Sequence, residues 1–228
     1  MTFRFYLILG IIPLALWLIH FRNKDKNREP WARLLLVVAV GGFSVYAAAG
    51  VEKIAQLLFN INFHPPGFFA LLFQQTFFVG VIEETIKFLV VWIFAYHSPF
   101  FDEPIDGLVY SAAAAIGFAT VENAMYASNM GFQVWIMRAF VSSLAHIMFS
   151  AIWGYELGRY RFERKEHIIV LFASLGIAAF CHGLFNTLVS QSYFWFLGIV
   201  FIAIVMWRIV KVLYRLAAAR TVALSRSR

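Results

Sequence analysis

Residues 80–89 read GVIEETIKFL, and runs rich in Phe, Leu and Val lie on both sides of them. Two adjacent carboxylates, Glu83 and Glu84, therefore fall inside a stretch that is otherwise apolar enough to cross a membrane. An ionisable group in hydrocarbon is costly unless it meets a partner or water, so such groups mark functional sites. This pair is our first candidate for part of an active site, provided that the segment spans a bilayer.

The composition is that of an integral membrane protein. Of the 228 residues, 62% are hydrophobic and only 14% are charged, and the mean hydropathy is +0.76. In soluble globular domains, charged residues make up about a quarter of the chain. The sequence therefore predicts an all-α polytopic membrane protein.

Apolar runs of roughly 20 residues, which cross about 30 Å of hydrocarbon as a helix, recur along the chain. We treat residues 1–228 as one membrane domain, with two peripheral helices in 1–60, the catalytic core in 68–190, and the last helix and a basic cytoplasmic tail in 193–228. Asp106 is the expected N-cap of the fourth span. The seven expected spans are 3–21, 33–58, 68–96, 107–128, 134–158, 168–190 and 193–215.

Basic residues predict the orientation of the chain. If the spans alternate in direction, almost all cations fall on one side, which is cytoplasmic by the positive-inside rule. The N-terminus is then outside and the C-terminus inside. Nucleic-acid binding is not expected from the net charge of +7, because the cations border spans and alternate with acids. The cations on that side are Arg22, Lys24, Lys26, Arg28, Arg33, Arg159, Arg161, Arg164, Lys165, Arg208, Lys211, Arg215, Arg220, Arg226 and Arg228.

Polar residues at membrane depth concentrate on four consecutive spans, whereas the first, second and seventh spans offer almost nothing comparable. Polar groups in lipid favour partners within the protein. We therefore expect a polar chamber inside a four-helix core. Its residues are Glu83, Glu84 and Lys87 on the third span, Glu122 and Asn123 on the fourth, Arg138, Ser142, Ser143 and His146 on the fifth, and His182 and Asn186 on the sixth.

Spacing refines this chamber. Glu83 and Lys87 are four residues apart on one helix face and can form an ion pair, whereas Glu84 points about 100° away and can meet a different neighbour. His182 and Asn186 are also four apart, so an imidazole and a carboxamide can point at one small volume. Such a pair can stabilise a developing oxyanion.

At this point the chain resembles the PrsW family of intramembrane proteases. Residues 83–87 match its EExxK motif, residues 118–122 its FxxxE motif and residues 182–186 its HxxxN motif, and the stretch 101–110 is similar to another characteristic segment. The family is related to the clan of type II CAAX prenyl endopeptidases and bacteriocin-processing enzymes. Many members of that clan have a histidine where this sequence has Glu122.

The resemblance implies that a glutamate activates the water that attacks a peptide carbonyl. Glu83 would be the general base and Glu84 would position it or share its proton, with Glu122 or His146 completing the water site. His182 and Asn186 would stabilise the oxyanion, and Lys87 would set the charge of the glutamates. The resemblance also implies regulated proteolysis of a membrane-anchored protein, such as an anti-sigma factor, in the inner membrane of a bacterium.

Several alternatives stay open. We expect no cofactor, yet Glu83, Glu122, His146 and His182 are residue types that a catalytic zinc accepts. A proton-coupled transporter could use the same residues as a relay, and a non-catalytic scaffold could retain them for helix packing. Arg138 and Lys53 are interpreted as cations that snorkel to the membrane interface.

Overall fold

A computed structural model of the chain describes residues 2–62, 65–163, 168–190 and 195–227. Within these ranges the helices form seven rods, two of which change between α-helical and π-helical winding. The predicted cations Arg164, Lys165 and Arg228 and the start of the predicted span 193–215 lie outside the described residues. The elements are α1 Phe3–Arg22, α2 Trp31–Phe59, α3 Phe68–Gln74, η1 Gln75–Gly80, α4 Val81–Val91, η2 Trp92–Tyr96, α5 Asp106–Met130, α6 Phe132–Met137, η3 Arg138–Ser142, α7 Ser143–Phe162, α8 Ile168–Ser190 and α9 Trp195–Ser227.

The all-helical polytopic fold predicted from composition is confirmed. Five described helices are long and apolar enough to cross a membrane, namely Phe3–Arg22, Trp31–Phe59, Asp106–Met130, Phe132–Phe162 and Ile168–Ser190. The predicted span 68–96 is one rod, but the π-helical segments η1 and η2 divide it and three charged residues interrupt its apolar run. Large apolar side chains face outward, such as Phe69 and Ile169, which are 82% and 77% exposed. A surface of this kind suits contact with lipid.

Helix α5 lies at the centre of the bundle. It packs against α1 and α2 on one side and α7 on another, and Ala112 to Ala115 are almost completely buried in these contacts. Small side chains let helix backbones approach closely in membranes. Glu122 therefore lies on a helix that packs against α1, α2 and α7, which are distant from one another in sequence.

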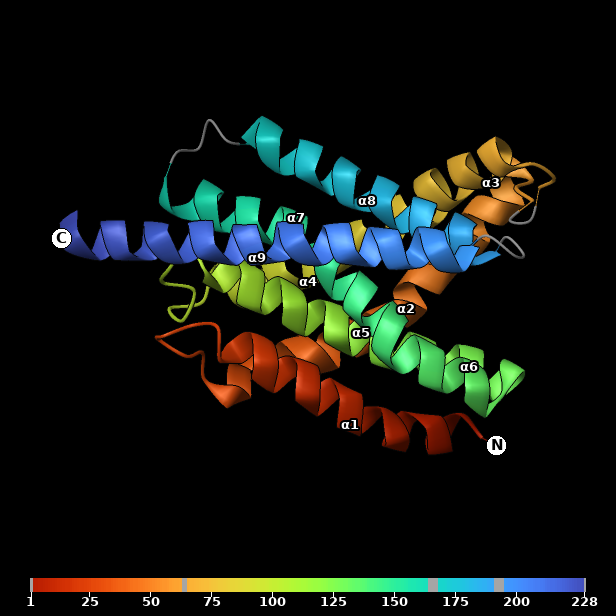
Figure 1. Cartoon of the computed structure of the whole chain (residues 1–228), viewed down its shortest axis with the longest axis horizontal. Coiled ribbons are helices and arrows are strands. Elements are labelled where there is room, and N and C mark those ends of the chain that lie inside the picture. Colours follow the sequence, from red (N-terminus) through yellow and green to blue (C-terminus); the bar gives the residue numbers. More distant parts are fainter. Residues whose placement is uncertain (1, 63–64, 164–167, 191–194, 228) are drawn as a thin grey trace.

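The two termini lie at opposite ends of the bundle (Figure 1). Helix α1 begins at the right-hand end, and α9 ends at the left-hand end, where the loop between α1 and α2 also lies. This arrangement agrees with an odd number of crossings. The end that we predict to be cytoplasmic is the left-hand end, because the basic loop after α1 lies there.

The predicted role of Asp106 as an N-cap is wrong. Asp106 is the first residue of α5, and the N-cap position is occupied by Ile105. Its Oδ2 instead accepts hydrogen bonds from the backbone N–H groups of Asp102 and Glu103, at 2.8 and 2.6 Å. The carboxylate therefore fixes the preceding loop rather than the first turn of the helix.

Candidate functional site

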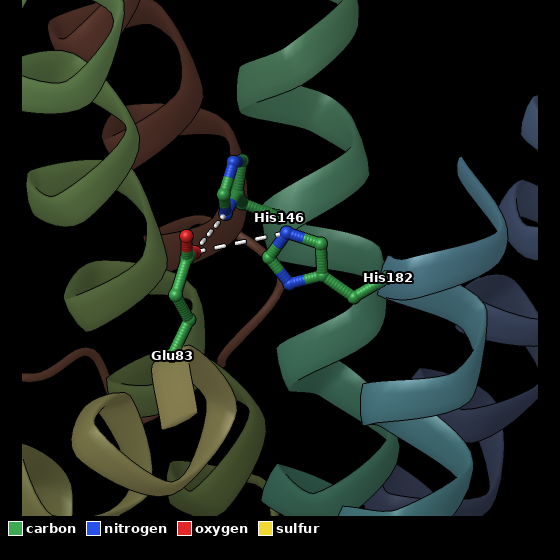
Figure 2. A group of neighbouring side chains, drawn as sticks. All are labelled: Glu83, His146 and His182. Atoms are coloured by element: carbon green, nitrogen blue, oxygen red, sulfur yellow. Dashed lines mark ion pairs between the residues drawn. The ribbon is translucent and has the colours of Figure 1, made fainter. Parts of the chain in front are cut away.

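Three side chains from three helices converge inside the bundle (Figure 2). Glu83 reaches in from α4, His146 from α7 and His182 from α8, and all three are buried. Glu83 Oε2 lies 3.7 Å from His182 Nε2 and 4.0 Å from His146 Nδ1. With Glu84, Lys87 and Glu122, described below, they form what we call the buried polar cluster.

The partners of each imidazole indicate its tautomer. Lys87 Nζ, which can only donate, lies 3.0 Å from His146 Nδ1, so a neutral His146 carries its proton on Nε2. His182 Nδ1 faces Glu84 Oε1 at 3.1 Å and donates to it, which leaves Nε2 of a neutral His182 as an acceptor. The lone pair of His182 Nε2 therefore remains free near Glu83, whose buried Oε2 has no hydrogen-bond partner, whereas the lone pair of His146 Nδ1 accepts from Lys87. Two acceptors that face each other, with a third nitrogen 4.0 Å from Glu83 Oε2, suit a bound water molecule or cation.

Glu84 is the most heavily hydrogen-bonded member of the cluster. Its Oε1 accepts from Lys87 at 2.6 Å as well as from His182. Its Oε2 accepts from Ser150 Oγ at 2.9 Å and from Trp153 Nε1 at 3.0 Å, both on α7. Glu84 is thus held in place by four donors, and it orients His182.

Lys87 joins the two glutamates of the motif. Its ammonium lies 3.6 Å from Glu83 Oε2, which confirms the predicted pair four residues apart, but its shorter contact is with Glu84. The ammonium also lies 4.6 Å from the centre of the Phe118 ring, a favourable cation–π contact. The side chain of Lys87 is fully buried, so these partners replace its hydration.

Glu122 joins the cluster from α5. Its Oε2 lies 3.0 Å from His146 Nε2 and 2.8 Å from Arg138 Nη2. The interpretation of Arg138 as a snorkelling cation is therefore wrong, because it pairs with Glu122 and its Nε donates to Asn123 Oδ1 at 3.0 Å. Glu122 thus does for His146 what Glu84 does for His182: a carboxylate faces the ring nitrogen that points away from Glu83.

Close packing of two rods places these groups together. A Cβ added at Gly80 would lie 2.3 Å from the backbone oxygen of Ala179, and one added at Gly183 would lie 2.4 Å from Thr76 Oγ1. Only glycine permits this approach of η1 to α8. The π-helical segments η1 and η3 lie just before Glu83 and His146 along the chain, and π-bulges frequently occur at functional sites.

Asn186 lies one turn from His182 on α8, as predicted. Its Nδ2 donates to Gln75 Oε1 at 3.3 Å. Among the described residues, this contact with η1 is the one hydrogen bond found for the Asn186 side chain. No hydrogen bond between Asn186 and Glu83 is found there. The structure therefore brings together Glu83, Glu84, Glu122, His146 and His182 directly, and places Asn186 at their edge.

Three contributors were missed at the sequence level. Ser150 and Trp153 hold Glu84, although a serine and a tryptophan on an apolar helix carry no signal of this role. Glu52, on α2, has a buried Oε1 without a hydrogen-bond partner, and its charge interacts with Glu122 and Lys87. Its signal was present, since it is the only acid in the expected span 33–58.

Comparisons with known proteins agree with the motifs. Residues 29–213 match the model of a family described as PrsW family intramembrane metalloprotease. A protein named Protease PrsW from Clostridioides difficile is 31% identical over 213 residues, covering 89% of this chain and 87% of the relative. A protein of the same name from Geobacillus kaustophilus is 30% identical, over 86% and 85% of the two chains, and one from Bacillus subtilis is 28% identical, over 82% and 83%. No solved structure matches the chain significantly.

Proposed function

Because the chain belongs to the PrsW family of intramembrane proteases, we propose that it hydrolyses a peptide bond of a membrane-anchored protein at the buried polar cluster. Membership identifies the chain as a peptidase, so the transporter and scaffold alternatives have no observation in their favour. The single observation that carries the assignment of the site is the convergence of Glu83, His146 and His182 around a buried carboxylate oxygen that accepts no hydrogen bond. A water molecule bound there would be polarised from three sides.

In the proposed reaction, Glu83 takes a proton from this water as its oxygen attacks the scissile carbonyl. A C–O bond forms, and the carbonyl oxygen gains negative charge. Glu83 then returns the proton to the leaving nitrogen as the C–N bond breaks, which gives a carboxylic acid and an amine. Glu84 and Glu122 hold His182 and His146 in place during both steps.

The donors for the oxyanion are at the edge of the cluster and within it. The tautomer indicated for His182 makes its Nε2 an acceptor, so this atom suits holding the attacking water better than donating to the oxyanion. Asn186 has an N–H group beyond the one bonded to Gln75, and the Lys87 ammonium lies within the cluster. We therefore assign oxyanion stabilisation to Asn186 and Lys87.

The same atoms also fit a divalent metal ion, a second candidate that one feature of the site favours. Ligand atoms of Glu83, His146 and His182 all lie within 4.8 Å of one another. The other nitrogen of each histidine faces a glutamate, the arrangement that orients histidine ligands in zinc sites. These three residues would hold the ion. When bound, zinc would make the attacking water more acidic and polarise the scissile carbonyl.

Metal analysis of active, purified protein decides between the two versions. The metal-dependent version predicts about one zinc per chain, loss of cleavage on chelation, and recovery when zinc returns. It also predicts that His146→Ala releases the zinc. The metal-free version predicts full cleavage after chelation in protein with substoichiometric metal.

His182→Ala and Asn186→Ala should each lower turnover by about a hundredfold or more, because one loses a group that holds water and the other an oxyanion donor. The measurement is cleavage of a membrane-anchored test substrate in proteoliposomes. His97→Ala and Asn129→Ala are matched controls, since both residues lie outside the cluster and are exposed. Unchanged turnover in the His182 and Asn186 variants would remove both from the site.

The position of the cluster in the bundle limits the class of substrate. The cluster lies within helices that suit a bilayer, so the substrate must present its peptide bond at membrane depth. We propose a membrane-anchored protein, cleaved in a regulated way in the inner membrane of a bacterium, for which an anti-sigma factor is the example that the motif resemblance implies.

A further inference from the structure

A second group of acids lies at the other end of α5, remote from the buried polar cluster. Asp25 and Glu29 belong to the loop between α1 and α2, and Asp106 is the first residue of α5. We call these three residues the acidic cluster. Sixteen residues of helix separate Asp106 from Glu122, which is about 24 Å along the axis. The acidic cluster is therefore a separate feature of the molecule.

The loop points its acids inward and its cations outward. Asp25 and Glu29 are each 2% exposed and Asp106 is 1% exposed. By contrast, Lys24, Lys26 and Arg28, which alternate with these acids, are exposed. The loop thus buries three carboxylates against α5 and leaves its positive charges in solvent.

These carboxylates lack a countercharge within the described part of the chain. In the buried polar cluster, Glu83, Glu84 and Glu122 each form ion pairs with a lysine or an arginine. No such pair within 4.0 Å is found for Asp25, Glu29 or Asp106 among the described residues. Arg22, whose charge acts on Asp25, donates its Nε to the backbone oxygen of Glu29 at 2.8 Å. Burying like charges together without a cation is unfavourable.

Two of the carboxylate oxygens are buried and have no hydrogen-bond partner. They are Oδ2 of Asp25 and Oδ1 of Asp106. Three further oxygens accept hydrogen bonds: Asp25 Oδ1 accepts from the backbone of Asn27, Asp106 Oδ2 accepts from two backbone N–H groups, and Glu29 Oε2 accepts from the Tyr110 hydroxyl. Each acid is thus oriented through one oxygen, and the side chains of Glu29 and Asp106 lie within hydrogen-bonding reach of each other. Ligand atoms of all three acids lie within 4.8 Å of one another.

We propose that the acidic cluster binds a hard divalent cation, Ca²⁺ or Mg²⁺, through the carboxylates of Asp25, Glu29 and Asp106. Ligands that are all oxygen favour these ions over zinc or copper. The cation supplies the missing positive charge and joins the α1–α2 loop to the start of α5. It acts on stability, and the catalytic residues of the proposed function are not part of it.

The alternative to a bound cation is protonation of the acidic cluster. Burial raises the pKa of Asp25 to about 6 and that of Glu29 to about 7, so the acids could also share protons. A group whose pKa is higher in the folded than in the unfolded state stabilises the fold as the pH falls. Proton sharing therefore predicts that stability rises as the pH falls from about 7 to about 4. It predicts no response to added cations.

The test uses the full chain in detergent micelles, freed of metal by chelation and dialysis. Thermal unfolding is followed at pH 7.5 with added Ca²⁺ or Mg²⁺ in separate titrations. We expect one or both to raise Tm by on the order of 5 °C at saturation, and the cation with the larger shift identifies the ligand. Asp25→Asn and Asp106→Asn should raise the cation concentration at half-effect by tenfold or more. Glu156→Gln, an acid paired with Arg159 at the same end of the bundle, should keep the full shift.

Two further measurements separate cation binding at the acidic cluster from metal binding at the buried polar cluster and from effects of the Asp variants on folding. The Tm shift should persist in His182→Ala, which separates it from any metal at the buried polar cluster. Equilibrium dialysis of that variant against ⁴⁵Ca²⁺ or ²⁸Mg²⁺ should give one bound cation per chain, a result that does not depend on whether the Asp variants fold. The proposal is overturned by an absence of any shift up to about 10 mM of either cation, by an undiminished shift in Asp106→Asn, or by stability that responds to pH alone.

Discussion

Glu83→Gln is expected to lower cleavage of a membrane-anchored substrate by about a thousandfold or more. The substitution keeps the shape of the side chain but removes the oxygen that can take a proton from water or bind a metal ion. In the structure, Glu83 Oε2 lies 4.0 Å from His146 Nδ1 and 3.7 Å from His182 Nε2. The measurement is the single-turnover rate of the purified full-length protein in proteoliposomes, with product detected by mass spectrometry.

The control for this prediction is Glu156→Gln, since Glu156 is a partly buried acid on α7 that pairs with Arg159 outside the cluster. It should retain turnover within about threefold, as expected for a substitution away from the site. The thermal stability of both variants must be compared with that of the wild type, because Glu83 also lies 3.6 Å from Lys87. A folded Glu83→Gln protein that cleaves at a rate within tenfold of the wild type would move the reactive group elsewhere.

Much of the fold could be predicted because it depends on local composition. The span predicted at 107–128 is helix Asp106–Met130, and the span predicted at 3–21 is helix Phe3–Arg22. Helical spacing likewise predicted the contact of Lys87 with Glu83, since both lie on one helix. Such features follow from the helical repeat and from the length of apolar runs.

Contacts between helices were harder to predict, because they depend on how each rod rotates about its axis. Nothing in the spacing of Ser150 and Trp153 reveals that both donate to Glu84. The partner of Arg138 was missed for a related reason: its place near a predicted span end suggested lipid, whereas Arg138, the first residue of η3, pairs with Glu122. Identifying polar residues at membrane depth therefore predicted the helices that carry Glu83, Glu122, His146 and His182, but it predicted neither the packing of α1 and α2 against α5 nor which atoms meet.

The tautomers of the two histidines illustrate the same limit. The sequence places an imidazole and an amide four residues apart, which favours the hypothesis that both donate to an oxyanion. In the structure, His182 Nδ1 lies 3.1 Å from Glu84 Oε1, so a neutral His182 donates its Nδ1–H to this carboxylate and has an acceptor at Nε2. We therefore propose Asn186 and Lys87 for the oxyanion role first predicted for His182, because a carboxylate on another helix determines which nitrogen of His182 is protonated.

Glu84→Gln should be the most destabilising single change in the buried polar cluster. Both oxygens of Glu84 accept two hydrogen bonds each, from Lys87 and His182 on one side and from Ser150 and Trp153 on the other. Whichever way a glutamine is turned, its NH₂ group faces two donors, and Lys87 loses its nearest countercharge. Breaking a buried ion pair from one side costs about 3–5 kcal/mol, which corresponds to a fall in Tm on the order of 10 °C for a chain of this size.

A double-mutant cycle tests whether this loss comes from the pair with Lys87. Lys87→Met removes the ammonium and keeps the apolar part of the side chain, so Glu84→Gln combined with Lys87→Met leaves no unpaired lysine. We expect the double variant to be at least about 2 kcal/mol more stable than the sum of the two single effects predicts. Additive effects would mean that Glu84 stabilises the bundle through Ser150, Trp153 and His182 alone. Cleavage should stay low in both variants that carry Glu84→Gln, because restoring stability does not restore the carboxylate that orients His182.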